Sequence, residues 1–300
     1  MKKKHLIVIV GPTAVGKTAS GIALAQHFTS EIISADSRQM YCELHIGTAS
    51  PTNEELNLAK HYFIKNKSVT EYYNASMFEV EVLELLERLF KSTDIVLLVG
   101  GSTLYIDALV NGIDDLPTVD IKLREHLMEK YKEEGIQFLR NHLKLLDPEH
   151  YSKVDLKNPN RMMKAIEVSM MTGKPYSTFL TSPQKERSFN IIKIGINRDR
   201  PELFERINLR VDQMIIDGLV DEVKSLEKFR STNALKTVGY REIFDYLDGS
   251  VSLEQAIEQI KTNTRRYAKR QITWFSRDKE MPWFNPEQKD QIIDFINAKL

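Results

Sequence analysis

Eight residues near the start of the chain have the types and the spacing that hold phosphate groups. They follow the apolar run Leu6–Val10 and open the expected helix Lys17–Phe28, and they are Gly11, Pro12, Thr13, Ala14, Val15, Gly16, Lys17 and Thr18. The glycines let the backbone wrap around an anion, and the amides at the start of the helix point toward it. Lys17 adds a mobile positive charge, and the Thr18 hydroxyl can bind Mg²⁺. Such loops are typical of ATP-binding and other nucleotide-binding proteins, so the motif predicts bound phosphates without identifying the molecule that carries them.

The carboxylate of a standard nucleotide hydrolase is missing from its usual position in the sequence. That position is the end of a second apolar strand, where an acidic residue holds the metal. The candidate strand, Asp94–Val99, ends instead in Gly100, Gly101 and Ser102. An acid stands at Asp36, after the short apolar strand Glu31–Ser34. Because ligands lie beyond the carboxyl ends of parallel strands, Asp36, the loop and Gly100–Ser102 should share one crevice.

Asp36 has three interpretations from its position alone. It is a metal ligand, a general base or a cap on the following segment, and capping is the ordinary role of an aspartate there. Its neighbours favour a functional role, because Ser37, Arg38, Gln39 and Tyr41 supply donors, acceptors and a ring. Such a set suits a polar, planar partner.

A second candidate site is the basic segment Lys261–Arg277, which holds six Lys or Arg and no Asp or Glu. At helical spacing its cations form two adjacent rows, one of Lys261, Arg265 and Lys269 and one of Arg266 and Arg270. A helical face whose charges are all positive, with aromatic residues interleaved, favours contact with a nucleic acid or polyphosphate. The alternative is a charged exterior over an aromatic core stripe.

Two further arginines lie four residues apart in a neighbouring segment. Arg206 and Arg210 share one helical face, where they could pair with acids such as Glu202. Alternatively, one of them enters the crevice and holds a leaving phosphate.

The order of the expected elements indicates an α/β fold with a parallel sheet. Strands and helices, among them the expected helix Phe78–Phe90, alternate as far as Asp94–Val99, and a strand is again expected at Asn190–Ile196. We predict a P-loop catalytic core from residues 1–118 and 184–300 and a helical insertion domain at 119–183. The helices expected in the insertion and in the helical C-terminal region are Ile121–Tyr131, Ile136–Leu146, Arg161–Met171, Pro201–Ile216, Val220–Lys228, Tyr240–Leu247, Leu253–Phe275 and Gln288–Leu300.

Composition narrows the class of protein. The 300 residues are 42% apolar and 28% charged, and apolar runs such as Leu6–Val10 are too short to span a bilayer. No signal-peptide cleavage pattern follows the basic start, and Cys42 is the only cysteine, so we expect a cytoplasmic protein without disulfides or membrane contact. The seven scattered histidines show no zinc-ligand spacing. The net charge of zero says nothing about the oligomeric state, and we take the chain as a monomer.

Together these stretches resemble the tRNA dimethylallyltransferases, also called tRNA isopentenyltransferases. The resemblance covers nearly the whole chain, and the combination of motifs is highly specific: GPTAVGKT, ISADSRQMY, IGTASP, VGGSTLY, NRMMKAIEV, RINLRVDQMIIDGLVDEV, TVGYREI and RRYAKRQITWF. Ser102 stands where the family usually has threonine, and Ser50 stands where lysine is common. The sequence lacks the zinc-binding extension of some eukaryotic relatives, so we expect the bacterial type.

The resemblance implies a reaction and roles for the residues. A dimethylallyl group moves from dimethylallyl diphosphate to N6 of the adenine at position 37 of tRNA, and diphosphate leaves. The loop, Arg210 and Mg²⁺ at Thr18 hold the diphosphate, while Asp36 takes the N6 proton with Ser102 beside it. The insertion clasps the anticodon stem-loop. The implied tRNA contacts are Asp36, Ser37, Arg38, Gln39, Ser102, Asn160, Arg161, Met162, Met163, Lys164, Lys261, Arg265, Arg266, Lys269 and Arg270.

Two other functions compete with this one. A P-loop kinase of a small metabolite fits the loop equally well. However, this sequence lacks the carboxylate expected at the strand end, and a kinase would leave the basic aromatic segment unexplained. A non-catalytic RNA-binding protein with a structural nucleotide predicts RNA binding that survives Asp36→Asn.

Overall fold

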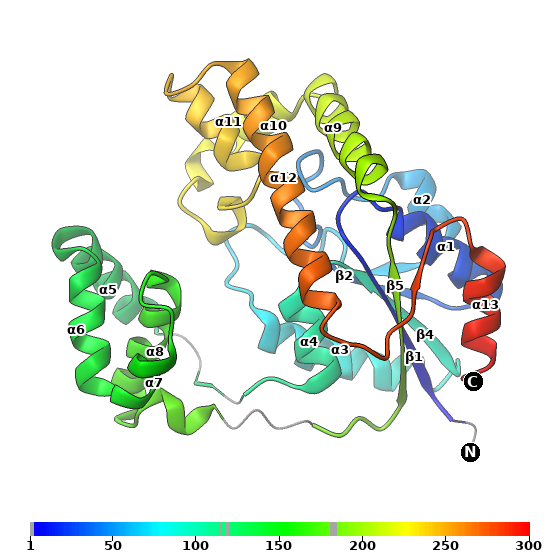
Figure 1. The fold of residues 1–300 in the computed structure, drawn as a ribbon, viewed down its shortest axis with the longest axis horizontal. Helices are drawn as coiled ribbons and strands as arrows, with labels where there is room; N and C mark the ends of the chain where they lie inside the picture. Colours follow the sequence, from blue (N-terminus) through cyan, green and yellow to red (C-terminus); the bar gives the residue numbers. More distant parts are fainter. Residues whose placement is uncertain (1–2, 115, 118–119, 181–184) are drawn as a thin grey trace. The chain divides into compact units, whose positions relative to one another are not determined.

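A parallel sheet lies at the centre of the larger part of the chain (Figure 1). The computed structural model describes residues 3–114, 116–117, 120–180 and 185–300. Within them the sheet has six strands in the order β3-β2-β4-β1-β5-β6, and every neighbouring pair is parallel. The strands are β1 (His5–Val10), β2 (Ile32–Ala35), β3 (His61–Tyr62), β4 (Ile95–Gly100), β5 (Asn190–Ile196) and β6 (Trp283–Phe284).

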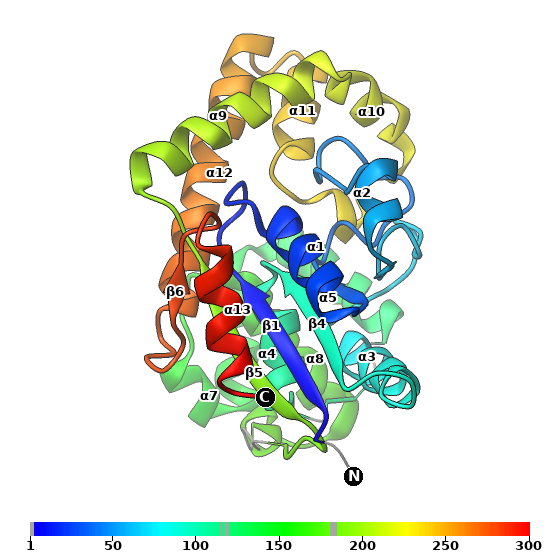
Figure 2. The same ribbon diagram turned by 90° about the vertical axis from the view of Figure 1, so that its right-hand side faces the viewer.

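The central strands are buried on both faces, as their unbroken apolar sequences require. Every residue of β1 is buried, and its side chains alternate between two cores. Leu6 and Val8 face one core, and Ile7 and Ile9 face the other. Helices α3 (Ala75–Leu89) and α4 (Thr103–Asn111) contribute to the first core, whereas α1 (Lys17–Phe28) and α13 (Lys289–Asn297) contribute to the second (Figure 2).

Four helices form a group after β5. They are α9 (Arg200–Ile216), α10 (Leu219–Ser225), α11 (Tyr240–Leu247) and α12 (Leu253–Phe275). The long helix α12 packs against both α9 and α11. It begins with a capping box in which the Ser252 hydroxyl accepts from the N–H of Gln255. These helices extend beyond the carboxyl ends of the strands, where a ligand is expected in a parallel sheet (Figure 1).

Residues Asn111–Lys185 form a separate unit with a core of its own. It contains α5 (Ile121–Glu134), α6 (Ile136–Leu146), α7 (Pro148–Lys153) and α8 (Pro159–Thr172). Its core includes Leu139, Leu143 and Ile166, all fully buried. The remaining residues, up to Val110 and from Glu186, form the other unit. The boundaries predicted from the sequence, at 118/119 and 183/184, lie outside the described residues.

The predicted P-loop α/β class is confirmed, and most expected elements occur within a few residues of their expected bounds. The prediction of only helices after β5 is wrong at Trp283–Phe284, which pair with Gly195 and Ile196. The expected helix Val220–Lys228 ends at Ser225 and continues as a short 3-10 turn. Helices α2 (Asn53–Leu58), α4 and α7 and the two-residue β3 were not predicted. None of the helices in the described ranges has both the length and the apolar content of a membrane span.

Candidate active site

The phosphate loop connects β1 to α1 in the form that its sequence predicts. Gly16 has a φ of 108° immediately before α1, a conformation that favours glycine because it has no Cβ. Ala14 also has a positive φ, of 64°. The ammonium of Lys17 bends back and donates to the carbonyl of Pro12 at 2.7 Å. The loop is therefore closed by its own lysine at the carboxyl end of β1.

Side chains from two later segments hold the outer edge of this loop. Arg206 donates from Nε to the carbonyl of Ala14 at 3.0 Å, and Arg198 donates from Nε to the carbonyl of Val15 at 3.1 Å. Arg198 also forms an ion pair with Glu202, so Glu202 is not the partner of Arg206. Holding these carbonyls fixes the orientation of the peptide units whose amides would face an anion.

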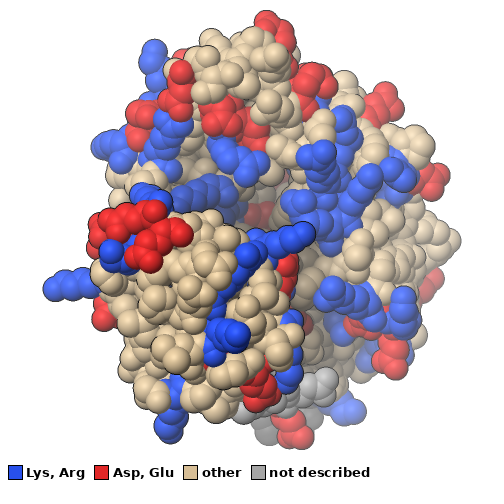
Figure 3. Space-filling view, turned by 60° about the vertical axis from the view of Figure 1, so that its left-hand side comes forward, with Lys and Arg blue, Asp and Glu red and all other residues tan. Residues whose placement is uncertain are grey.

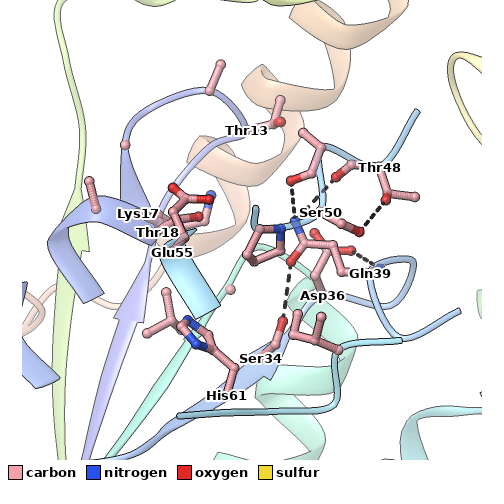
Figure 4. Close-up of a pocket in the computed structure, with 18 of the residues that line it drawn as sticks. Thr13, Lys17, Thr18, Ser34, Asp36, Gln39, Thr48, Ser50, Glu55 and His61 are labelled. Carbon is pink, nitrogen blue, oxygen red and sulfur yellow. Dashed lines mark hydrogen bonds between the residues drawn. The ribbon is translucent and has the colours of Figure 1, made fainter. Parts of the chain in front are cut away.

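A cavity of 380 Å³ lies over the loop. Its lining combines Lys17 and Thr18 of the loop with Ser34 and Asp36 from the end of β2 (Figure 4). Gly100 at the end of β4 and two arginines of α9 complete this part of the lining. Burial lowers the pKa of the Lys17 ammonium to about 8, with Arg210 acting in the same direction and Asp36 against it. A desolvated ammonium of this kind is stabilised by an anion that takes the place of the lost water. The polar lining residues include Thr13, Lys17, Thr18, Asp36, Gln39, Thr48, Glu55, Arg206, Arg210 and Gln271.

Arg210 is a partly buried cation with no hydrogen bond or ion pair to any residue that the structure describes. Its pKa is lowered by burial and then by the nearby charge of Arg206, while Glu55 and Asp36 oppose that shift. A buried guanidinium without a partner is costly for the fold, because its five N–H donors lose water. The side chain lines the cavity and is positioned to receive an anion there.

Asp36 caps the turn that follows β2 and still has a free oxygen. Its Oδ1 accepts from the backbone N–H groups of Arg38 at 2.9 Å and Gln39 at 3.3 Å. Its Oδ2 has no hydrogen-bond partner among the described residues. The capping interpretation is therefore correct for one oxygen, and the other remains available for chemistry.

Asp36 also borders a second cavity, of 260 Å³. The second cavity is lined by Ser37 and Arg38 on one side and by α9, α11's entry loop and α12 on the other. The residues common to the two cavities are Thr13, Asp36, Thr48, Ala49, Arg210 and Tyr267. The carboxylate thus stands where two spaces adjoin, one of which contains the phosphate loop.

Ser102 supports this carboxylate from the end of β4. It is 7% exposed, and its Oγ accepts from the backbone N–H of Ser37 at 2.8 Å. Tyr267 of α12 makes a side-chain hydrogen bond with Ser102. Burial, followed by the charge of Asp36, raises the pKa of the Tyr267 phenol to about 12, so it stays protonated. Ser102 does not line the cavity over the phosphate loop, although Gly100 does.

The segment from His45 to Ser50 is held by two polar side chains, and its residues Thr48 and Ala49 line both cavities. Glu222 of α10 accepts from the backbone N–H groups of His45, Ile46 and Gly47 at 2.8–3.1 Å. Gln39 donates to the carbonyls of Thr48 at 3.3 Å and Ala49 at 3.0 Å (Figure 4). The sequence marked this segment only through its resemblance to a family motif.

The basic helix α12 is divided between packing and exposure. Lys261 forms an ion pair with Asp212 at 2.7 Å, and Arg265 donates to Asn208 at 2.6 Å, so both are occupied by α9. Three other cations, Arg266, Lys269 and Arg270, are exposed. Figure 3 shows Lys and Arg side chains gathered over broad areas of one face. Of the two expected rows, the row of Lys261, Arg265 and Lys269 therefore contacts α9 through its first two members, whereas both members of the Arg266 and Arg270 row are exposed.

In the helical unit, the predicted contact residues of α8 fall into two groups, one buried and one accessible to solvent. Met162 is fully buried and Met163 is 7% exposed, and both belong to the core of the unit. Their side chains therefore cannot touch an RNA, which corrects the expectation for these two residues. Asn160 and Arg161 are exposed, and Lys164 lies partly buried 4.0 Å from Glu167.

The fold and the site define a P-loop α/β protein with a cavity lined by Lys17, Arg206 and Arg210 and bordered by the Asp36 carboxylate. Residues 39–278 match the family model described as IPP transferase. Over 300 residues, the whole of both chains, the sequence is 52% identical to tRNA dimethylallyltransferase 1 of Bacteroides fragilis. The chain therefore belongs to the IPP transferase family, and the predicted resemblance is confirmed.

Solved structures agree with this assignment. A tRNA isopentenylpyrophosphate transferase from Bacillus halodurans is 36% identical with a TM-score of 0.72, and the match covers 99% of this chain and 97% of that one. A eukaryotic dimethylallyltransferase acting on tRNA is 29% identical with a TM-score of 0.75, over 90% of this chain and 69% of that one. Membership of this family decides against the small-metabolite kinase and the non-catalytic RNA-binding protein.

Proposed function

We propose that this protein transfers a dimethylallyl group from dimethylallyl diphosphate to N6 of adenine 37 in tRNA and releases diphosphate. Transfer of a dimethylallyl group to tRNA follows from membership of the family. Beyond that, we propose the identity of the donor, the atom that accepts the group and the roles of the residues. The observation that carries them is the position of Asp36 between two cavities, one of which contains the phosphate loop.

The cavity over the loop suits the diphosphate of the donor. Loop amides, Lys17 and Arg210 would bind its oxygens, and their charge would offset the charge that develops on the leaving group. Because Arg210 lacks a partner among the described residues, it has its donors available for this role. Mg²⁺ would supply further charge neutralisation, and oxygen donors that fit it, the Thr18 hydroxyl and the Glu55 carboxylate, line the same cavity.

The second cavity suits a flipped adenine. An adenine must leave its stack to reach an enclosed carboxylate. Ser37 and Arg38 line this cavity and would contact the base, while Gln39, which lines the neighbouring cavity, would contact its surroundings. As the allylic C–O bond breaks, its electron pair leaves with the diphosphate, and the N6 lone pair forms the new C–N bond. Asp36 would take the N6 proton through its free Oδ2, while Ser102 holds the turn in place.

The remaining RNA contacts would come from exposed polar side chains. On α12 these are Arg266, Lys269 and Arg270, and on α8 they are Asn160 and Arg161. Lys261, Arg265 and Lys164 would act mainly through the helices that they support, since each is partly buried beside a protein partner. The proposed place of action is the cytoplasm.

The test is a transfer assay with radiolabelled dimethylallyl diphosphate, Mg²⁺ and unmodified tRNA. The matched substrate is the same tRNA with guanine in place of adenine 37. Label on the first RNA alone would support donor, acceptor and base together. Label on both RNAs would contradict the acceptor, and label on neither, with both RNAs folded, would contradict the reaction.

A further inference from the structure

Gln271 of α12 joins the phosphate loop to the loop that follows β4. It is 3% exposed, so its amide is withdrawn from water. Its Oε1 accepts from the backbone N–H of Thr13 at 2.9 Å, and its Nε2 donates to the carbonyl of Gly101 at 2.8 Å. Both ends of one amide are used, each on a different loop.

The two loops belong to different halves of the site. Thr13 lies in the phosphate loop, which would bind the donor. Gly101 precedes Ser102, which accepts from Ser37 N–H and so supports the turn of Asp36 on the acceptor side. A single side chain therefore connects the phosphate loop to the loop that supports the turn of Asp36.

The contact at Gly101 is close because glycine has no side chain. A Cβ at that position would lie 2.4 Å from Nε2 of Gln271, so any other residue there would displace the amide from its present position. Such a bridge also needs one acceptor and one donor on the same group, which an amide has and a carboxylate or thioether lacks. In a buried position these two hydrogen bonds are stronger than they would be in water.

We infer that Gln271 is a positioning residue that fixes the distance between the phosphate loop and the turn carrying Asp36. This inference rests on the proposed function, because the two halves have separate roles only if the donor and the acceptor bind there. Each half would still bind its own substrate without the bridge. What the bridge supplies is alignment, and misplacement by about 1 Å can reduce a rate about 100-fold.

The first variant is Gln271→Met, which keeps the volume and removes both hydrogen bonds. We expect kcat to fall by about 10- to 100-fold, with the Kd values for tRNA and for dimethylallyl diphosphate each within about threefold. Gln259→Met is the matched control, because Gln259 is exposed on the same helix. A loss confined to the Kd for dimethylallyl diphosphate would overturn the inference. An unchanged kcat per folded molecule, with only a lower Tm, would overturn it as well.

A second variant, Gln271→Glu, tests the donor and remains informative if the methionine variant does not fold. A protonated glutamic acid can accept from Thr13 and donate to Gly101, whereas a carboxylate faces the Gly101 carbonyl without a proton. The activity of Gln271→Glu relative to the unmodified protein should therefore rise as the pH falls. The titratable groups that line the same cavity are common to both proteins, so the ratio of activities isolates the new group. They are Lys17, Asp36, Glu55, His61, Arg206, Arg210 and Tyr267.

A flat ratio would contradict the proposed bridge. The unmodified protein also serves as the reference for the proposed function. If it transferred no label to tRNA, the reaction would be refuted, whereas normal transfer by both it and Gln271→Met would refute only the positioning role.

Discussion

The Oγ of Ser102 lies 2.8 Å from the backbone nitrogen of Ser37 and accepts its hydrogen bond. Ser102 follows β4 and Ser37 follows β2, and these strands are neighbours in the sheet. One hydroxyl thus ties together two strand ends at the residue next to Asp36. Threonine at position 102 would keep the same oxygen.

Ser102→Ala should slow transfer and destabilise the protein. It leaves the Ser37 N–H without its acceptor in a buried place, which costs about 1–3 kcal/mol. We expect a lower free energy of unfolding in a urea titration and a single-turnover rate reduced by about tenfold. Ser102→Thr is the control and should keep the rate within about threefold. Equal rates for Ser102→Ala and the unmodified protein would contradict a supporting role.

Asp36→Asn separates the capping role from the proposed chemistry. The amide oxygen can still accept from Arg38 and Gln39, so the turn should persist. The variant loses the basic oxygen, and we expect the single-turnover rate to fall by about 10²–10⁴-fold, the usual contribution of a general base. The free energy of unfolding should change by less than about 1 kcal/mol. A near-normal rate would show that Asp36 is only a cap.

The charge of Lys17 predicts how donor binding depends on pH. The pKa of this ammonium is lowered to about 8, so in the free protein it is charged below that pH and neutral above it. The Kd for dimethylallyl diphosphate should therefore rise between about pH 7 and about pH 9. Tyr267 keeps its proton over this range because its pKa is about 12. Isothermal titration calorimetry measures the Kd.

Lys17→Met provides the control for that pH dependence. Its Kd should be higher at every pH and should lack the rise assigned to the ammonium. A Kd for the unmodified protein that stays constant up to about pH 9 would contradict the role of Lys17 in donor binding.

The parts of the site that could be predicted from sequence are those coded by short continuous segments. The phosphate loop needs its glycines and lysine at fixed spacing, and the rule for strand ends placed Asp36 beside it. Gln271, Arg198 and Glu222 could not be found in this way. Each contacts a backbone group far away in the chain. A single glutamine or glutamate in a helix, or a single arginine in the loop before α9, has no sequence pattern of its own.

The errors of the sequence reasoning also have physical causes. Met162 and Met163 lie in a motif of the family, but helical periodicity turns them toward the core of their unit. The pairing of Lys261 with Asp212 depends on how α9 and α12 pack, which charge spacing along one helix does not reveal. The two-residue strands β3 and β6 are too short to show an alternating pattern.

Arg210→Ala should weaken donor binding without harming the fold. The side chain has no hydrogen bond or ion pair to a described residue, so its removal relieves a buried charge instead of breaking a contact. We expect the Kd for dimethylallyl diphosphate to rise by about tenfold or more, with Tm unchanged or higher. Arg200→Ala, an exposed arginine of the same helix, is the control and should leave both quantities unchanged. A marked fall in Tm would show that Arg210 is structural.

Truncation of two adjacent residues of α8 should affect different properties, stability for Met162 and RNA binding for Arg161. Met162 is fully buried, so Met162→Ala should lower the free energy of unfolding by about 2–5 kcal/mol. Arg161 is exposed, so Arg161→Ala should change stability by less than about 0.5 kcal/mol. If Arg161 meets a phosphate of tRNA, its loss should also reduce the slope of log K against log salt by about one. Filter binding over a series of salt concentrations measures this slope, and an unchanged slope would remove Arg161 from the proposed RNA contacts.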